Sequence, residues 1–350
     1  MTTKKRYQDE IIMALLKAKL IDDSSTSIFE FLPSRGITAH VTIDNDRSFF
    51  VKKLNDTPVN GSLWLEKIKA LNILSEETFP PSPQRVFSSN SWFCDEYLTE
   101  YSTFASCLDS VKHLIAAKKL GTSLARLHNS SQDQIHTIIQ SAGLGFQSQC
   151  ALSAQGPLQL HDYAAFPGLD RDMFLRVSQR CADAITILAS TLSETCIVHG
   201  DLLGTNILLE NQSAGNFKLI DWDRAGIGDP AWDLGHLFAA LFRRWLQVCG
   251  ADFSDITSFL AASGKQWIHY AVWYDEFINA YFSESEAHKI PTTKIIMIAG
   301  HALLERSRNI LSHKGIFSRR DTLTLTFSAQ MLCQPSACID AFIPSLSMDD

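Results

Sequence analysis

The chain has 350 residues and a formal net charge of −7, from 31 Lys and Arg against 38 Asp and Glu. This balance disfavours a nucleic-acid-binding protein, which needs a basic surface, so no nucleic-acid partner is predicted. The 45% of hydrophobic residues predicts a large buried core, and no run reaches the roughly 18 apolar residues of a transmembrane helix, so no membrane partner is predicted either.

The first hundred residues predict one helix and then an antiparallel sheet. Apolar residues recur at helical spacing over 11–20, which indicates an amphipathic helix. Residues 28–54 alternate in short apolar bursts around a turn signal at 44–46, a pattern typical of strands. Residues 62–74 return to helical spacing, and 85–98 predict two further strands around a Ser-Asn turn. These patterns together predict an antiparallel sheet with one inserted helix.

Beyond about residue 105 the pattern becomes mainly helical. Helices are predicted at 111–130, 174–192, 266–282, 292–312 and 321–333. Residues 197–221 look strand-like, and 131–172, rich in Gln, Ser, Ala and Gly, is predicted to be a loop or insert. The fold class is therefore α+β, with a small β-rich lobe over residues 1–100 and a larger helical lobe over 101–350. A cleft between two lobes is a natural ligand site.

The stretch "NILLENQSAGNFKLIDWD" predicts a β-hairpin with polar residues at its open end. Asn206 comes just before the first strand, and Asp221 follows the second. Because antiparallel strands place the start of one beside the end of the other, these side chains should meet. Asp201 lies in the loop that leads into the same end. Three oxygen-bearing side chains thus converge behind apolar strands.

Amide and carboxylate oxygens suit Mg²⁺, which keeps positions open for water and phosphate oxygens. The spacing His199-Gly200-Asp201-(x4)-Asn206 also matches the H-R-D-x-x-x-x-N signature of protein kinases, with Asp221 as the downstream metal-binding Asp. The alternative is a structural hairpin end whose Asp and Asn residues only cap turns.

With these motifs in place, the sequence resembles the aminoglycoside phosphotransferase/choline kinase family of protein-kinase-like small-molecule kinases. Three stretches carry the likeness: "HGDLLGTNILL", "LIDWDRAGIGDPAWDLGHL" and "LGTSLARLHNS". The resemblance spans about residues 30–310, is specific at 199–236 and is weak in the first hundred residues. It implies a protein-kinase-like bilobal fold.

The resemblance also assigns roles. Asp201 would be the catalytic base for a substrate hydroxyl, and Asn206 and Asp221 would hold the metal. Asp223 either assists the metal or substrate, pointing the same way as Asp221 on a continuing strand, or is a solvated loop carboxylate. Asp233 would brace the catalytic loop.

His199 is expected to support the catalytic loop as well, rather than act as a base. Asp229, directly before Pro230, is expected to cap the helix that starts there. One departure stands out: the family often has His-Pro-Gly, or a similar trio, just before the Asn, where this chain has Leu203-Gly204-Thr205.

The nucleotide half of the cleft needs a cation for the phosphates. "SFFVKKL" is similar to the kinase strand that carries the phosphate-binding lysine, which favours Lys52 over Lys53. Adjacent strand residues face opposite ways, so only one of the two can face the cleft. Glu66, on the following helix, is the expected partner of Lys52, its alternative being a surface pair with Lys69.

Other nucleotide contacts are less distinct in the sequence. The segment "PSRGITAH" offers one glycine, Gly36, as a phosphate loop and lacks G-x-G-x-x-G. The passage "WFCDEYLTEY" resembles the hinge that binds adenine through backbone groups, which points to Glu96 and Leu98. The cofactors implied are ATP and Mg²⁺.

Eight cysteines are present without a C-x-x-C pair, which disfavours a zinc ribbon or a thioredoxin-type motif. Most lie in apolar stretches, and the N-terminus lacks a signal-peptide cleavage site, so a reducing, cytoplasmic location is expected.

The function expected is ATP-dependent phosphorylation of a hydroxyl on a small molecule: a sugar, an aminoglycoside, an amino alcohol or a related metabolite. A protein kinase is disfavoured because only eleven residues separate Asp221 from Asp233 and no A-P-E follows. A non-catalytic nucleotide-binding scaffold is disfavoured because Asp201, Asn206 and Asp221 are all present. Aromatic and acidic residues of the helical lobe either cradle an ammonium group or are simply core and surface. They are Asp255, Trp267, Trp273, Tyr274, Asp275, Glu276 and Arg306.

Overall fold

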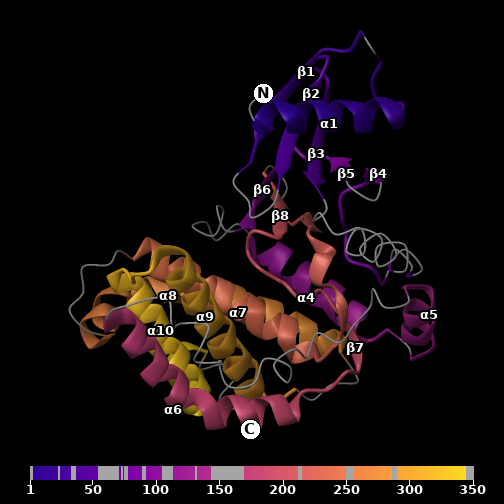
Figure 1. The fold of residues 1–350 in the computed structure, drawn as a ribbon. Coiled ribbons are helices and arrows are strands. Elements are labelled where there is room, and N and C mark those ends of the chain that lie inside the picture. The colour runs from indigo at the N-terminus through magenta and orange to yellow at the C-terminus, as the bar shows by residue number, and fades with distance from the viewer. Residues whose placement is uncertain are drawn as a thin grey trace.

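A computed structural model shows a small sheet stacked on a larger helical body (Figure 1). It describes residues 3–22, 24–32, 37–53, 71, 74, 78–88, 92–104, 113–130, 132–142, 169–211, 215–249, 256–285 and 290–343. The α+β, protein-kinase-like fold class is confirmed by this arrangement and by the solved structures compared below.

The small lobe is a five-stranded antiparallel sheet in the order β1-β2-β3-β5-β4. Its strands are β1 (Ser27–Phe31), β2 (Thr38–Ile43), β3 (Arg47–Lys53), β4 (Arg85–Ser88) and β5 (Trp92–Glu96). The turn predicted at 44–46 joins β2 to β3, with Asp44 and Asn45 at φ values of 53° and 57°. Asp and Asn are the residues that tolerate this left-handed conformation best after glycine.

Helix α1 (Thr3–Lys17) covers one face of this sheet (Figure 1). Ile11 and Leu15, one helical turn apart, are buried against Val41, Val51 and Trp92 of the strands. The predicted N-terminal amphipathic helix is therefore confirmed. The predicted helix over 62–74 lies almost wholly outside the described residues.

Two short sheets connect the small lobe to the helices. Strand β6 (Tyr101–Thr103) pairs with β8 (Ile207–Glu210), which pairs with β9 (Phe217–Leu219). Strand β7 (Cys196–Val198) pairs antiparallel with β10 (Gly226–Gly228). The predicted hairpin is thus confirmed, and these sheets fix both ends of the segment that carries Asp201.

The large lobe consists of helices around one apolar core. Its helices are α4 (Leu114–His128), α5 (Gln132–Ala142), α6 (Leu169–Thr191), α7 (Pro230–Val248), α8 (Ile256–Glu284), α9 (Thr292–Lys314), α10 (Arg319–Cys333) and α11 (Pro335–Phe342), with a 3₁₀ turn η4 (Trp222–Arg224) before β10. Asp229 caps α7 by accepting a hydrogen bond of 2.9 Å from the Ala231 N–H, as the Asp-Pro pair predicts.

One prediction for this lobe was wrong in part. The segment 131–172 was expected to be a loop or an insert, but its described ends are helical and not loop: α5 occupies 132–142, and α6 begins at residue 169. Ile135 and Ile138, nearly one turn apart, are buried, so the apolar spacing within a Gln- and Ser-rich segment was the missed signal.

None of the helices among the described residues combines the length and apolar character needed to cross a membrane. The boundary between lobes at residue 100 stays a prediction.

The close packing of α4 on α8 gives a stability test. A Cβ added at Gly121 would lie 2.2 Å from the Phe277 carbonyl oxygen and 3.0 Å from the Tyr281 nitrogen, both backbone atoms of α8. We expect Gly121→Ala to lower the free energy of unfolding by about 1–3 kcal/mol, because the helices must separate. Gly264→Ala is the control, since its Cβ would meet nothing within 4 Å and alanine favours a helix. Denaturant unfolding that left both variants equally stable would contradict this packing.

Candidate active site

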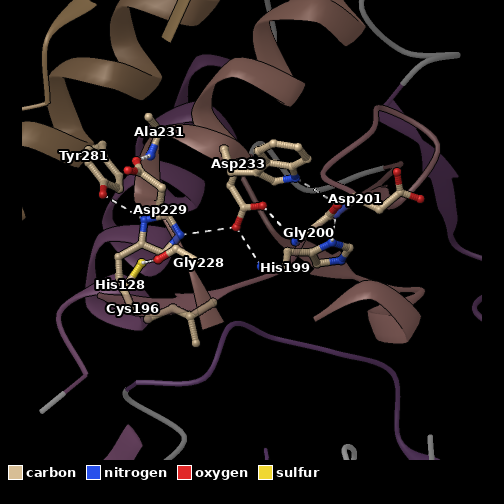
Figure 2. A network of polar contacts seen from close by, with 12 residues as sticks. His128, Cys196, His199, Gly200, Asp201, Gly228, Asp229, Ala231, Asp233 and Tyr281 are labelled. Atoms are coloured by element: carbon tan, nitrogen blue, oxygen red, sulfur yellow. Dashed lines mark hydrogen bonds and ion pairs between the residues drawn. The ribbon is translucent and has the colours of Figure 1, made fainter. Parts of the chain in front are cut away.

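The buried carboxylate of Asp233 holds the loop that carries Asp201. Its two oxygens accept hydrogen bonds from the backbone N–H groups of His199, at 2.7 Å, and Gly200, at 2.9 Å. Figure 2 shows Asp233 between these groups and His128, while the Asp201 carboxylate points away from the network. The first turn of α7 thus sets where β7 ends and where the catalytic segment begins.

His128 supports Asp233 from the last turn of α4. Its Nε2 lies 3.2 Å from the Asp233 carboxylate and its Nδ1 2.8 Å from the Tyr281 hydroxyl of α8. Because an ionised carboxylate only accepts, the Nε2 of His128 carries a hydrogen and donates it to Asp233. Complete burial would raise the pKa of Asp233, but the hydrogen bond from His128 and the charges and donors around it outweigh burial and lower that pKa.

His199 is held by hydrogen bonds on both ring nitrogens. Nε2 donates to the Ile220 carbonyl at 3.0 Å, and Nδ1 accepts from the Asp201 N–H at 3.3 Å. The ring is fully buried and packs on Trp222 at 4.5 Å between centroids. These two hydrogen bonds tie the ring to the catalytic loop and to the end of the β8–β9 hairpin, and its role as a support in preference to a base stays a prediction.

Gly200 explains why a glycine separates His199 from Asp201. Its φ is +78°, and a Cβ there would lie 2.2 Å from the Arg224 carbonyl oxygen. Only glycine combines this backbone conformation with so close an approach. Among the described residues, no side chain or backbone group hydrogen-bonds the Asp201 carboxylate. This carboxylate is therefore available to bind the hydroxyl of a substrate.

The hairpin brings Asn206 and Asp221 to one end, beside Asp201. The Ile220 N–H donates to the Asn206 carbonyl at 3.0 Å, and the Asn206 side-chain amide donates to the Asp201 carbonyl at 2.9 Å. That bond turns the Asn206 Oδ1 away from Asp201's backbone. Asp221 follows in a left-handed conformation, with φ 62° and ψ 55°.

Lys52 reaches from the small lobe to this end of the hairpin. Its ammonium lies 2.5 Å from the Asp221 carboxylate and 2.6 Å from that of Asp223. The strand expected to continue past Asp221 instead ends at Leu219, and Asp223 lies in the turn η4. The expected geometry was therefore wrong, although both carboxylates still face the same partner.

Electrostatics indicate that this place requires a cation. Burial raises the pKa of Asp221, repulsion from Asp223 adds to the rise, and Lys52 opposes it. Burial would lower the pKa of Lys52, but the two carboxylates outweigh it and raise that pKa. The lysine ammonium thus stands where two repelling carboxylates need positive charge.

The donor set fits Mg²⁺. A carboxylate from Asp221 and an amide oxygen from Asn206 are hard ligands, and so small a set leaves positions for phosphate oxygens and water. Within the described ranges no three His, Cys, Asp or Glu side chains form a metal cluster, so an all-protein cage of these residue types is absent there. The arrangement suits an ion that is shared with a bound phosphate.

The structure describes some of the other residues that were predicted to bind the nucleotide, but not all of them. Lys53 faces away from the cleft, bonding Glu10 of α1 at 3.1 Å, so Lys52 is the lysine that faces inward. Glu96 ends β5, and its N–H already donates to the Gln84 carbonyl at 3.0 Å. Leu98 follows in the connection to β6 and is buried. Gly36 and Glu66 lie outside the described residues.

Two groups near the site were missed by sequence reasoning. Arg85 pairs with Asp95 across β4 and β5, and burial raises the pKa of Asp95 to about 6 against the opposing pull of Arg85 and Lys52. His236 stacks on Trp232 at 4.9 Å, and burial lowers its pKa while Asp201 acts in the opposite direction. His236 lies within "GDPAWDLGHL", so its place on the predicted helix was an available signal.

The aromatic residues considered for an ammonium site belong to the core. Trp267 donates to the Phe342 carbonyl at 2.8 Å and Trp273 to the His113 carbonyl at 3.1 Å. Tyr274 is fully buried, with its hydroxyl 3.3 Å from the Leu234 carbonyl. Of the two interpretations left open, core packing is the one that these contacts favour.

Replacing Asp233 with Asn tests the brace. We expect Asp233→Asn to lower the free energy of unfolding at pH 7 by about 3 kcal/mol, because an amide leaves the N–H and His128 donors poorly paired. Asp183→Asn, at an exposed position on α6, is the control and should be near neutral. Equal denaturation midpoints for the two variants would contradict the role of Asp233.

The difference in the free energy of unfolding between the wild type and Asp233→Asn should also depend on pH. Because the pKa of Asp233 is lowered in the fold, the stability it supplies is fully present above the unfolded pKa of about 3.9 and declines as pH falls through the folded pKa. Denaturant titrations should therefore show that this difference in unfolding free energy becomes smaller only below about pH 4. A gap that widened with acid would have the wrong sign.

Comparisons with known proteins agree with this geometry. A choline kinase from Streptococcus pneumoniae superposes with a TM-score of 0.58 at 15% identity, over 93% of this chain and 99% of that one. A Plasmodium vivax ethanolamine kinase gives 0.56 at 15%, over 95% and 89%. A glucosamine kinase gives 0.54 at 17%, over 90% and 83%. At such identities the likeness shows a shared fold.

Of the two sequence comparisons, one finds a match and the other does not. Comparison with curated proteins gives no match. A family model described as the phosphotransferase enzyme family matches residues 40–287, which include Lys52, Asp201, Asn206, Asp221 and Asp233. This match covers well over half of the chain and confirms the predicted family and the predicted phosphotransferase activity. The chain belongs to the phosphotransferase enzyme family.

Proposed function

We propose that the protein transfers the γ-phosphate of ATP, with Mg²⁺, to a hydroxyl of a small molecule. The observation that carries this proposal is the meeting of Lys52 with Asp221 and Asp223 beside the Asn206 and Asp201 loop. Phosphoryl transfer demands little covalent work from a protein and much positioning of charge, which is what this arrangement offers.

Each residue has a part in that reaction. Asp221 and the Asn206 amide oxygen would hold Mg²⁺, which neutralises charge on the phosphates when bound. Lys52 would exchange its carboxylate partners for phosphate oxygens, since its ammonium binds either kind of anion. Asp201 would orient the acceptor hydroxyl and take its proton. His199, Gly200 and Asp233 keep that carboxylate in place.

Solved relatives of the fold support nucleotide use without fixing the acceptor. One is described as a ternary complex of streptomycin and ATP with an aminoglycoside phosphotransferase, with a TM-score of 0.55 at 17% identity. A protein substrate fits poorly here, because η4, β10 and the start of α7 use up the segment between Asp221 and Asp233. A cytoplasmic location stays a prediction from the cysteines and the N-terminal sequence.

The test is ATP consumption with Mg²⁺ and a panel of hydroxylated metabolites and aminoglycosides. We expect Asp201→Asn to lower kcat by about 10²–10⁴-fold, the range for loss of a general base. Asp221→Asn should weaken Mg-ATP binding, measured by calorimetry with and without Mg²⁺, because a metal ligand is lost. Asp183→Asn, exposed on α6, is the matched control with unchanged turnover.

The outcomes separate the alternatives. Turnover that survives Asp201→Asn would exclude the proposed base, and Mg-ATP binding unaffected by Asp221→Asn would exclude the metal ligand. Tight Mg-ATP binding without ATP consumption by the wild type, with or without any acceptor, would instead favour the non-catalytic scaffold.

A further inference from the structure

A pocket borders the loop between Asp201 and Asn206 on the side of α7. Leu203, Gly204 and Thr205, the trio at which this chain departs from the family pattern, form one wall. Phe104 and four residues of α7 complete the lining: Ala240, Arg243, Arg244 and Gln247. The pocket is small, with a cavity volume of about 30 Å³, which gives room for one compact group of a substrate and not for a whole molecule.

The pocket lies close to the proposed base. Leu203 is two residues from Asp201, so their Cα atoms are at most about 7 Å apart. The loop is compact, because the Leu203 N–H bonds the Asp201 carbonyl at 2.8 Å and the Asn206 N–H bonds the Leu203 carbonyl at 2.8 Å. The pocket wall thus begins within about 7 Å of Asp201 along the loop, a distance comparable to the length of a small acceptor.

Arg243 brings positive charge to this pocket without a counter-charge in the described structure. Among the described residues, no carboxylate pairs with Arg243 or with its neighbour Arg306 of α9. Burial lowers the pKa of the Arg243 guanidinium, and repulsion from Arg306 lowers it further. A partly buried guanidinium beside a second cation is costly unless an anion joins it.

This charge stands out in an acidic chain. The protein carries a net charge of −7, yet the α7–α9 side of the catalytic loop presents Arg243 and Arg306 together. Nearby, Glu305 is already paired with Arg308 at 2.8 Å. Choline, ethanolamine and glucosamine, named in the related kinases, carry a positive amine, for which such a surface is repulsive.

We propose that the acceptor carries an anionic group, a carboxylate or a phosphate, which binds Arg243 in the pocket formed by Leu203, Gly204 and Thr205. This inference rests on the proposed phosphotransfer to a hydroxyl and narrows its substrate class to hydroxylated anions. Arginine suits the role because its planar guanidinium binds both kinds of oxyanion in a bidentate manner. Arg306 adds long-range attraction.

The test uses acceptors in pairs that differ in one charged group. Glucosamine 6-phosphate is compared with glucosamine, glucuronate with glucose, and homoserine with 3-amino-1-propanol, by kcat and KM for ATP-dependent phosphorylation. We expect at least one anionic member to exceed its partner in kcat/KM by about 10–100-fold, the effect of a charged hydrogen bond. The first pair reports a phosphate site and the other two a carboxylate site.

Variants at Arg243 connect the preference to the pocket. Arg243→Gln should erase it through a higher acceptor KM, whereas Arg243→Lys should restore part of it because the charge remains. Arg180→Gln, an exposed arginine on α6, is the control and should keep the preference. Preference for the neutral or cationic members, or an anion preference that survives Arg243→Gln, would overturn the proposal.

A binding measurement covers the case in which no pair is phosphorylated. Inorganic phosphate and acetate, added without nucleotide, should raise the melting temperature of the wild type more than that of Arg243→Gln. Equal shifts would overturn the anion site. ATP hydrolysis by the wild type without acceptor, compared with Asp201→Asn, tests the proposed function separately. If ATP turnover favours neutral acceptors, the proposed function is supported and the anion site is excluded. If anions bind through Arg243 but ATP is not turned over, the anion site is supported and the proposed function is excluded.

Discussion

The site depends on one buried carboxylate. Asp233 has no exposed surface, yet it stays charged because His199, Gly200 and His128 all donate to it. Burying an unpaired charge would be prohibitive, so the loop, α4 and α7 must meet in one geometry to satisfy it. That geometry leaves Asp201 pointing outward as the next residue along the chain (Figure 2). Rigid placement of this kind is what positional catalysis requires.

A second electrostatic link joins the two lobes. Lys52 belongs to the five-stranded sheet, whereas Asp221 and Asp223 follow the hairpin of the large lobe. The lysine and its carboxylates offset one another in the absence of other ions. A metal-bound phosphate group supplies both charges at once, positive for Asp221 and negative for Lys52. The residues whose contacts hold the lobes together could thus also bind a metal-bound phosphate group.

Much of this could be predicted from the sequence, for reasons that are local. The hairpin follows from two apolar strands around a turn, and antiparallel pairing alone brings Asn206 to Asp221. Alternation along β3 lets only one of Lys52 and Lys53 face the cleft, and the resemblance of "SFFVKKL" to the kinase strand favours Lys52. Contacts between distant segments could not be predicted: His128 with Asp233 is 105 residues apart in sequence, and the charge of Arg243 near the catalytic loop depends on how α7 and α9 pack. The η4 turn after Leu219 was missed because the left-handed Asp221 has no glycine to announce it.

The most direct measurement of the central claim is anomalous diffraction from crystals grown with Mn²⁺ and a non-hydrolysable ATP analogue. Mn²⁺ replaces Mg²⁺ at oxygen sites and can be located without reference to the protein coordinates. The account predicts an anomalous peak about 2.0–2.3 Å from both the Asn206 Oδ1 and the Asp221 carboxylate, in contact with the phosphates of the analogue. A metal and nucleotide bound elsewhere, with Lys52 still held between Asp221 and Asp223, would contradict it.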